Sequence, residues 1–147
     1  VGSPNEIDTS SDSDVTNTGY YTRKTIDESV NGADNLQMSN GMANYIFFRY
    51  ADVLLMYAEA LNELTASYEV PSWDGSITYT ISRNVEDMRT GIKPIRMRAG
   101  VPDYDADTYS NPIKFRIKLK RERQIELFAE GQRYFDLRSW CDAPAAG

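Results

Sequence analysis

The segment at 49–64, RYADVLLMYAEALNEL, constrains the fold more than any other part of the sequence. When successive residues are placed 100° apart around a helix axis, its charged side chains gather in one narrow stripe. The stripe contains Arg49, Asp52, Glu59 and Glu63, with Met56 among them. Apolar residues cover about two-thirds of the circumference, which is wider than the apolar stripe of an ordinary surface helix. We therefore predict a helix over 46–65 that is packed from at least two sides, with its charges facing charged residues on another helix.

The composition excludes several classes of functional site. The 147 residues include no histidine and a single cysteine, Cys141. Without histidine, a Ser-His-Asp triad and an HExxH zinc site are impossible within this chain, and one cysteine cannot form an internal disulfide or a multi-cysteine metal cluster. The net charge of −6 argues against nucleic-acid binding, and no apolar run is long enough to cross a membrane. We expect no catalytic residue, no metal and no cofactor.

The sequence divides into two regions near residue 45. Residues 1–44 are polar, acidic and rich in Asn, Gly and Ser, so we predict an irregular or extended segment. In 45–147 apolar residues recur with helical spacing, which predicts an all-α fold. Because the chain begins at Val1 without a signal-peptide pattern, we also expect it to be processed or to be a fragment of a longer protein.

A second helix is predicted after a linker at 66–76 that contains several helix breakers. Its apolar residues recur at spacings of four, four and three. They are Ile77, Ile81, Val85 and Met88. The helix is expected to run from 77 toward Arg98, with a break or kink at Gly91 and Pro94.

Two more helices are predicted beyond an irregular loop at 99–112. Asn111 is suited to cap a helix, and Pro112 to occupy its first position, which predicts a helix over 112–129. Gly131 indicates a tight turn, and a short helix over 132–140 follows it.

Arg121 and Glu126 stand out in the helix at 112–129, because each falls within an apolar face. The apolar neighbours are Ile117, Ile125 and Phe128 for Arg121, and Phe115 and Leu119 for Glu126. Charged side chains are rarely buried unless they are paired. We therefore predict that both residues meet opposite charges from other helices. The available partners are Asp52, Glu59, Arg133 and Arg138.

Three charged patterns could carry chemistry, and each has a simpler interpretation. Glu126 and Glu130 could lie at the carboxyl separation of a glycosidase, but neighbouring arginines should keep both ionised, whereas a general acid needs a raised pKa. The basic residues at 113–123 scatter around the helix, as expected for a solvated surface. The acidic residues at 103–107 begin like a calcium loop, but the glycine and glutamate required further along are missing.

Aromatic residues near loops are the remaining candidates for ligand contact. Those in or beside loops are Trp73, Tyr79, Tyr104 and Tyr109. Tyr and Trp commonly cover the edge of a core with their polar ends in water, which is the simpler explanation for most of them. Trp73 is the best single candidate for binding a ligand.

Two segments resemble the signatures of the SusD/RagB family, which occurs at the surface of Bacteroidetes. They are FRYADVLLMYAEALNEL at 48–64 and RERQIELFAEGQRYFDLRSW at 121–140. YYTRK at 20–24 and RMRAGVPDY at 96–104 resemble shorter family features in the same order. The resemblance covers roughly residues 20 to 140.

The resemblance implies an all-α fold of tetratricopeptide-like helix pairs with long irregular loops. It also implies a lipoprotein on the outer face of the outer membrane that binds glycans or other nutrients for polysaccharide utilization, without catalysis. The partner would be a SusC-type TonB-dependent transporter, and the lipid anchor would lie outside this chain. On this interpretation 45–147 is the C-terminal part of a SusD-like domain.

The charged residues of the two signatures are expected to form a structural network that locks the helices together. They are Arg49, Asp52, Glu59, Arg121, Glu126, Arg133 and Asp136. The alternative is a tetratricopeptide-like module that binds a protein or peptide and no sugar.

Overall fold

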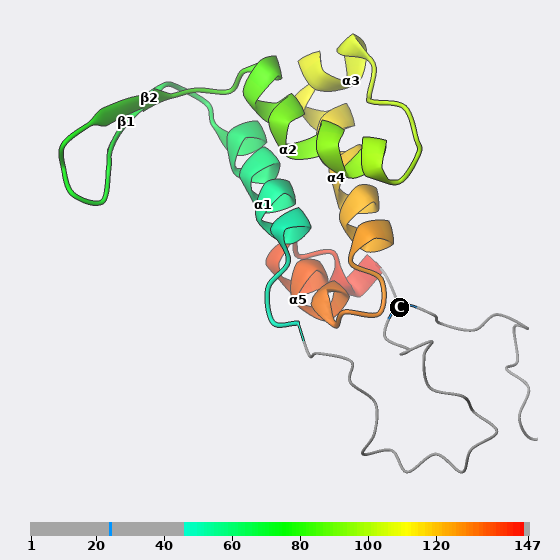
Figure 1. Cartoon of the computed structure of the whole chain (residues 1–147). Coiled ribbons are helices and arrows are strands. Elements are labelled where there is room, and N and C mark those ends of the chain that lie inside the picture. Colours follow the sequence, from blue (N-terminus) through cyan, green and yellow to red (C-terminus); the bar gives the residue numbers. More distant parts are fainter. Residues whose placement is uncertain (1–23, 25–45, 146–147) are drawn as a thin grey trace, which may run out of the picture. The chain divides into compact units, whose positions relative to one another are not determined.

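The computed structural model describes Lys24 and residues 46–145, so the irregular segment predicted at 1–44 lies outside the described part except for Lys24. The elements are α1 (Tyr50–Glu63), β1 (Tyr68–Pro71), β2 (Thr78–Ile81), α2 (Val85–Arg98), α3 (Ala106–Ser110), α4 (Pro112–Glu126), α5 (Gln132–Ser139) and a short 3₁₀ helix, Ala143–Ala145. Helices dominate these residues (Figure 1), which confirms the predicted all-α class.

The core forms where α1 packs against both α2 and α4, so α1 has the two-sided packing that its wide apolar surface predicts. The largest fully buried side chains come from four helices. They are Leu55 and Leu61 of α1, Met88 and Ile92 of α2, Tyr109 of α3, and Phe115 and Leu119 of α4. Burying each large apolar side chain contributes about 1.5–3 kcal/mol, so this cluster supplies the main driving force for assembly of the helices.

Helix α2 is continuous from Val85 to Arg98, so of the predicted break or kink at Gly91 and Pro94, the break does not occur. Gly91 lies where α2 approaches α1 most closely. A Cβ at this position would lie 2.6 Å from the Leu54 carbonyl oxygen and 2.8 Å from the Ala58 Cβ. The glycine therefore permits close packing of two helices and does not end one.

Residues 78–81 form the strand β2, so the prediction that α2 begins at 77 is wrong. β1 and β2 form an antiparallel hairpin in which Tyr68 pairs with Ile81 and Val70 with Tyr79. A spacing of four residues keeps side chains on one face of a strand as well as of a helix, and Thr-Tyr-Thr-Ile is rich in β-branched and aromatic residues. The helix starts instead after Asn84, whose side chain accepts a hydrogen bond from the Asp87 N–H at 2.8 Å.

The predicted start of α4 is confirmed, because Pro112 occupies the first turn and the Asn111 side chain accepts hydrogen bonds from two backbone N–H groups at 3.0 Å.

The loop predicted at 99–112 contains the short helix α3, which was not predicted. Gly131 adopts a φ of 76° between α4 and α5, as expected for a tight turn. α4 ends three residues earlier than predicted, at Glu126, and α5 ends one residue earlier, at Ser139.

Candidate functional site

A buried ion network joins α1, α4 and α5, with Arg123 of α4 at its centre. The Arg123 side chain is only 5% exposed. Its Nη1 donates to Asp52 Oδ1 of α1 at 2.9 Å, and its Nη2 and Nε donate to the Asp136 carboxylate of α5 at 2.8 and 3.1 Å. Burial alone would lower the pKa of Arg123, but the bonds to Asp136 and Asp52 outweigh it and raise the pKa. Buried charges persist in proteins when they are paired in this way.

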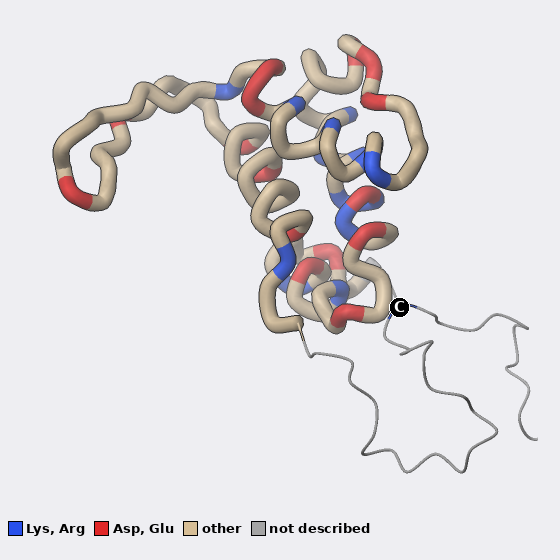
Figure 2. Tube along the Cα trace, in the orientation of Figure 1, with Lys and Arg blue, Asp and Glu red and all other residues tan. Residues whose placement is uncertain are grey.

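A second cluster forms around Glu126, at the end of α4. Arg49, which precedes α1, pairs with both Glu126 and Glu130, and Arg98 of α2 pairs with the same Glu126 carboxylate. Burial alone would raise the pKa of Glu126, but the bonds from Arg98 and Arg49 hold it below its usual value. Glu126 therefore meets opposite charges from other segments, although not from the partners predicted. Figure 2 shows acidic and basic positions close together near the ends of α1 and α4.

The rest of the α1 stripe contacts α4 and the end of α5. Glu59 accepts a hydrogen bond from the indole Nε1 of Trp140, and Glu63 pairs with Arg116 of α4. With Arg49 and Asp52, these residues place the charged stripe of α1 against polar and charged groups of the neighbouring helices.

Arg121 does not lie in the interior, and the prediction that it is buried is wrong. Arg121 and Arg133 are both exposed, and both line a shallow surface hollow. The apolar residues around Arg121 on the helical wheel are exposed as well. Their exposed fractions are 64% for Ile117, 63% for Ile125 and 62% for Phe128. The core covers the opposite face of α4. Arg123, two residues further along, therefore occupies the buried position.

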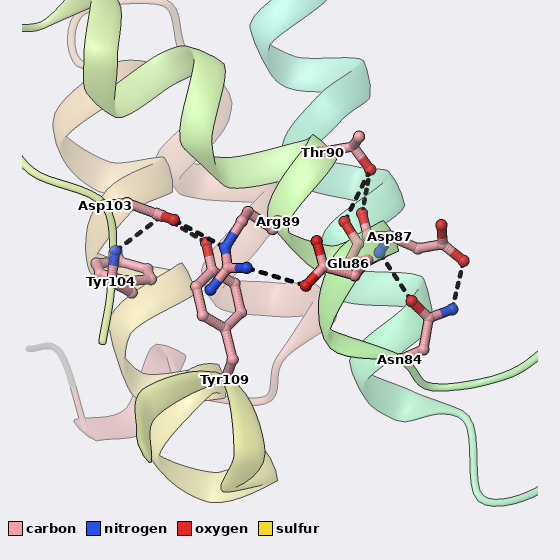
Figure 3. Close-up of polar contacts among 8 residues, drawn as sticks. All are labelled: Asn84, Glu86, Asp87, Arg89, Thr90, Asp103, Tyr104 and Tyr109. Carbon is pink, nitrogen blue, oxygen red and sulfur yellow. Dashed lines mark hydrogen bonds and ion pairs between the residues drawn. The ribbon is translucent and has the colours of Figure 1, made fainter. Parts of the chain in front are cut away.

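Asp103, in the loop between α2 and α3, organises a third cluster (Figure 3). Its carboxylate accepts hydrogen bonds from Arg89 Nε of α2 at 3.0 Å and from the Tyr109 hydroxyl of α3 at 2.7 Å. The Arg89 guanidinium lies 5.1 Å from the centre of the Tyr109 ring. Burial and then the hydrogen bond to Asp103 raise the pKa of Tyr109, so the hydroxyl remains a donor.

A similar arrangement fastens α2 to α4. Glu122 of α4 is buried and pairs with Arg96 of α2, and it accepts a hydrogen bond from the Tyr104 hydroxyl at 2.8 Å. The Arg96 guanidinium lies 4.2 Å from the centre of the Tyr104 ring, within the range of a cation–π interaction. Every helix of this core therefore contacts another through a charged or aromatic pair.

The chemistry available to these groups is limited, because they satisfy one another. Among the described residues, no buried side-chain polar atom lacks a hydrogen-bond partner. No group of three or more potential metal ligands occurs in that part of the chain. The lowered pKa of Glu126 makes this carboxylate a poor general acid. The arrangement is suited to holding helices together.

The hairpin presents the other candidate, Trp73, at its tip. The Trp73 side chain is 98% exposed. The turn beside it is ordered by Asp74, whose Oδ1 accepts hydrogen bonds from the Ser72 hydroxyl at 2.6 Å and from the backbone and hydroxyl of Ser76 at 3.1 and 2.8 Å. The bonds from Ser72 and Ser76 lower the pKa of Asp74 to about 2. Trp73 is thus held by a defined turn, away from the charged clusters.

Sequence reasoning missed Arg123 and Glu122 as buried charged residues. The signal was present, since both share a face of α4 with Phe115, Leu119 and Glu126 at helical spacings. Two apolar faces compete in this helix, however, and periodicity alone does not say which one faces the core.

Comparison with known proteins gives two matches. The model of the SusD family matches residues 1–146. The chain is also similar to a protein described as SusD-like protein P38, from Formosa agariphila, with 32% identity over 109 residues. That match covers 70% of this chain and 18% of the relative, so the chain spans only a small part of its length. No solved structure matches the chain. None of the described helices combines the length and apolar character needed to cross a bilayer.

Proposed function

Because the chain belongs to the SusD/RagB family, we propose that the protein binds glycans or other nutrients at the cell surface without converting them chemically. The observation that carries this proposal is the family match, which extends over nearly the whole chain. We assign the protein to the outer face of the outer membrane, as a lipoprotein, and its partner to the SusC-type TonB-dependent transporters.

The polar architecture supports a binding role over a catalytic one. Asp52 and Asp136 share one buried arginine, and Glu126 contacts two arginines. The two arginines hold the pKa of Glu126 below its usual value, whereas acid catalysis near neutral pH requires a carboxyl group whose pKa is raised. We therefore assign the paired signature residues to the scaffold, which are Arg49, Asp52, Glu126 and Asp136.

The proposal is tested with the full-length protein by calorimetry and affinity electrophoresis against plant and host glycans. We expect saturable binding of at least one glycan, no turnover of chromogenic glycosides, and co-purification with the transporter. Turnover of a glycoside would contradict the proposal.

The alternative is a tetratricopeptide-like module that binds protein alone, and the exposed apolar hairpin is the feature that favours it. Absence of binding to every glycan, together with a retained transporter partner, would establish this alternative.

A further inference from the structure

The hairpin formed by β1 and β2 has one apolar face and one polar face. Because neighbouring residues of a strand point to opposite sides, the pairing places four apolar or aromatic residues on the same side. They are Tyr68, Val70, Tyr79 and Ile81. Ile81 packs against the core, whereas the other three are exposed. The opposite face carries Glu69 and Thr80, which are joined by a hydrogen bond of 2.8 Å.

The hairpin extends away from the helices (Figure 1), and its tip is well defined. Besides the bonds to Asp74, the Ser72 N–H donates to the Ile77 carbonyl at 2.7 Å, and the Ile77 N–H donates to Ser72 Oγ at 3.1 Å. The turn therefore fixes the backbone on both sides of Trp73, so little backbone entropy remains to be lost when the indole is bound.

The other described residues leave the aromatic face of the hairpin uncovered, so this face is available to a partner. A two-stranded hairpin is at best marginally stable in water unless its apolar face packs against another element. Among residues 46–145, only the end nearest the helices, at Ile81, is packed against the core. Tryptophan is among the residues that most often dominate binding energy in interfaces between proteins. The apolar face and Trp73 together have the properties of a docking surface.

The geometry favours a protein over a glycan as the occupant. Small-molecule sites are concave, with polar groups directed at the ligand, whereas this surface projects. The hydroxyl groups of Ser72 and Ser76 are directed at Asp74 and serve the turn.

The charge of the hairpin defines the partner surface further. Residues 66–82 contain Glu69 and Asp74 and no lysine or arginine, and Figure 2 shows the first basic position only at the base of the hairpin. Electrostatic complementarity across an interface then calls for basic residues on the partner.

We propose that the β1–β2 hairpin is a docking arm that inserts Trp73 into an apolar pocket of the transporter, rimmed by lysine or arginine side chains. The identity of the partner rests on the function proposed above. The arm then contributes to holding the two proteins together and does not contact the glycan.

The test compares the full-length wild-type protein with Trp73→Ala and with Thr78→Ala, a matched control on the polar face of the same hairpin. The affinity of each for the purified transporter is measured by biolayer interferometry, and glycan affinity by calorimetry. We expect Trp73→Ala to weaken transporter binding by about 30-fold, as truncation of a dominant interface tryptophan does. Thr78→Ala should leave it unchanged, and neither variant should alter glycan affinity. Glu69→Lys should slow association and reduce its dependence on salt.

Four outcomes would overturn the docking arm. If the wild type binds the transporter and Trp73→Ala binds equally well, this inference fails while the proposed function stands. If Trp73→Ala loses glycan affinity alone, the hairpin is a sugar-stacking element. If oxidative footprinting shows the Trp73 indole already protected in the full-length protein without its partner, the hairpin packs within its own polypeptide. If the wild type does not bind the transporter, the proposed partnership fails and the docking arm with it.

Discussion

Replacing Arg123 by methionine should destabilise the protein strongly, because it removes the only cation seen between Asp52 and Asp136 in the described part of the chain. Methionine retains most of the length and apolar character of the arginine stem, so the change removes charge and donors with little loss of packing. Three hydrogen bonds of 2.8 to 3.1 Å disappear. Two carboxylates would then remain buried without their partner.

The expected loss follows from that burial. The side chains of Asp52 and Asp136 are each 11% exposed, so water replaces the lost arginine poorly. Removing one partner of a buried ion pair typically costs about 3–5 kcal/mol. Since native domains are stable by only about 5–15 kcal/mol, this loss is a large fraction of the total unfolding free energy.

Urea denaturation, monitored by circular dichroism, measures this loss. With a denaturant slope of about 2 kcal/mol per molar, the midpoint should fall by about 2 M. Arg121→Met is the matched control, because it makes the same chemical change two residues away on the exposed face of α4. That variant should remain within about 0.5 kcal/mol of wild type.

The interaction free energy between Arg123 and Asp52 can be separated from the other effects of each substitution. A double-mutant cycle with Arg123→Met and Asp52→Asn should give an interaction free energy of about 1–3 kcal/mol. If Arg123→Met lowers the unfolding free energy by less than 1 kcal/mol, or by no more than Arg121→Met does, the description of the network as a structural lock is refuted.

Three further predictions concern packing, capping and pH. Gly91→Ala should cost about 1–3 kcal/mol in thermal unfolding, because its Cβ would press on the backbone of α1; a stabilisation would show that the helices separate easily. Asn111→Ala should cost about 0.5–2 kcal/mol by removing the cap of α4, and an unchanged urea midpoint would exclude a capping role. The raised pKa of Tyr109 favours the neutral phenol in the folded state. The contribution of this phenol to the unfolding free energy is therefore complete below the unfolded-state pKa and is lost as pH rises. Between pH 10 and 11 the unfolding free energy of the wild type should fall by about 1 kcal/mol more than that of Tyr109→Phe. Equal losses of unfolding free energy in parallel urea titrations would contradict the burial of this hydroxyl.

The helices were predictable where one local signal dominated. The wide apolar surface of α1 requires packing on two sides, and Asn111 followed by Pro112 specifies the start of α4. These signals act through neighbouring residues and need no knowledge of tertiary structure.

The errors arose where two interpretations share the same spacing or composition. Residues 77 and 81 are four apart, which is compatible with a helix and with a strand, and the pairing to β1 decided the outcome. α4 has two apolar faces, and only the positions of α1 and α5 select the one with Arg123. The arrangement of buried charges is therefore a property of the assembled helices.

The glycan affinity of the folded Arg123→Met variant tests most directly whether the charged signature residues serve the scaffold. The full-length variant and wild type are titrated by calorimetry with a glycan that the wild type binds, at a temperature where the folded fraction of each is known. The dissociation constant per folded molecule should be the same for both. A weaker affinity that the folded fraction does not explain would place the network in ligand binding and contradict the account.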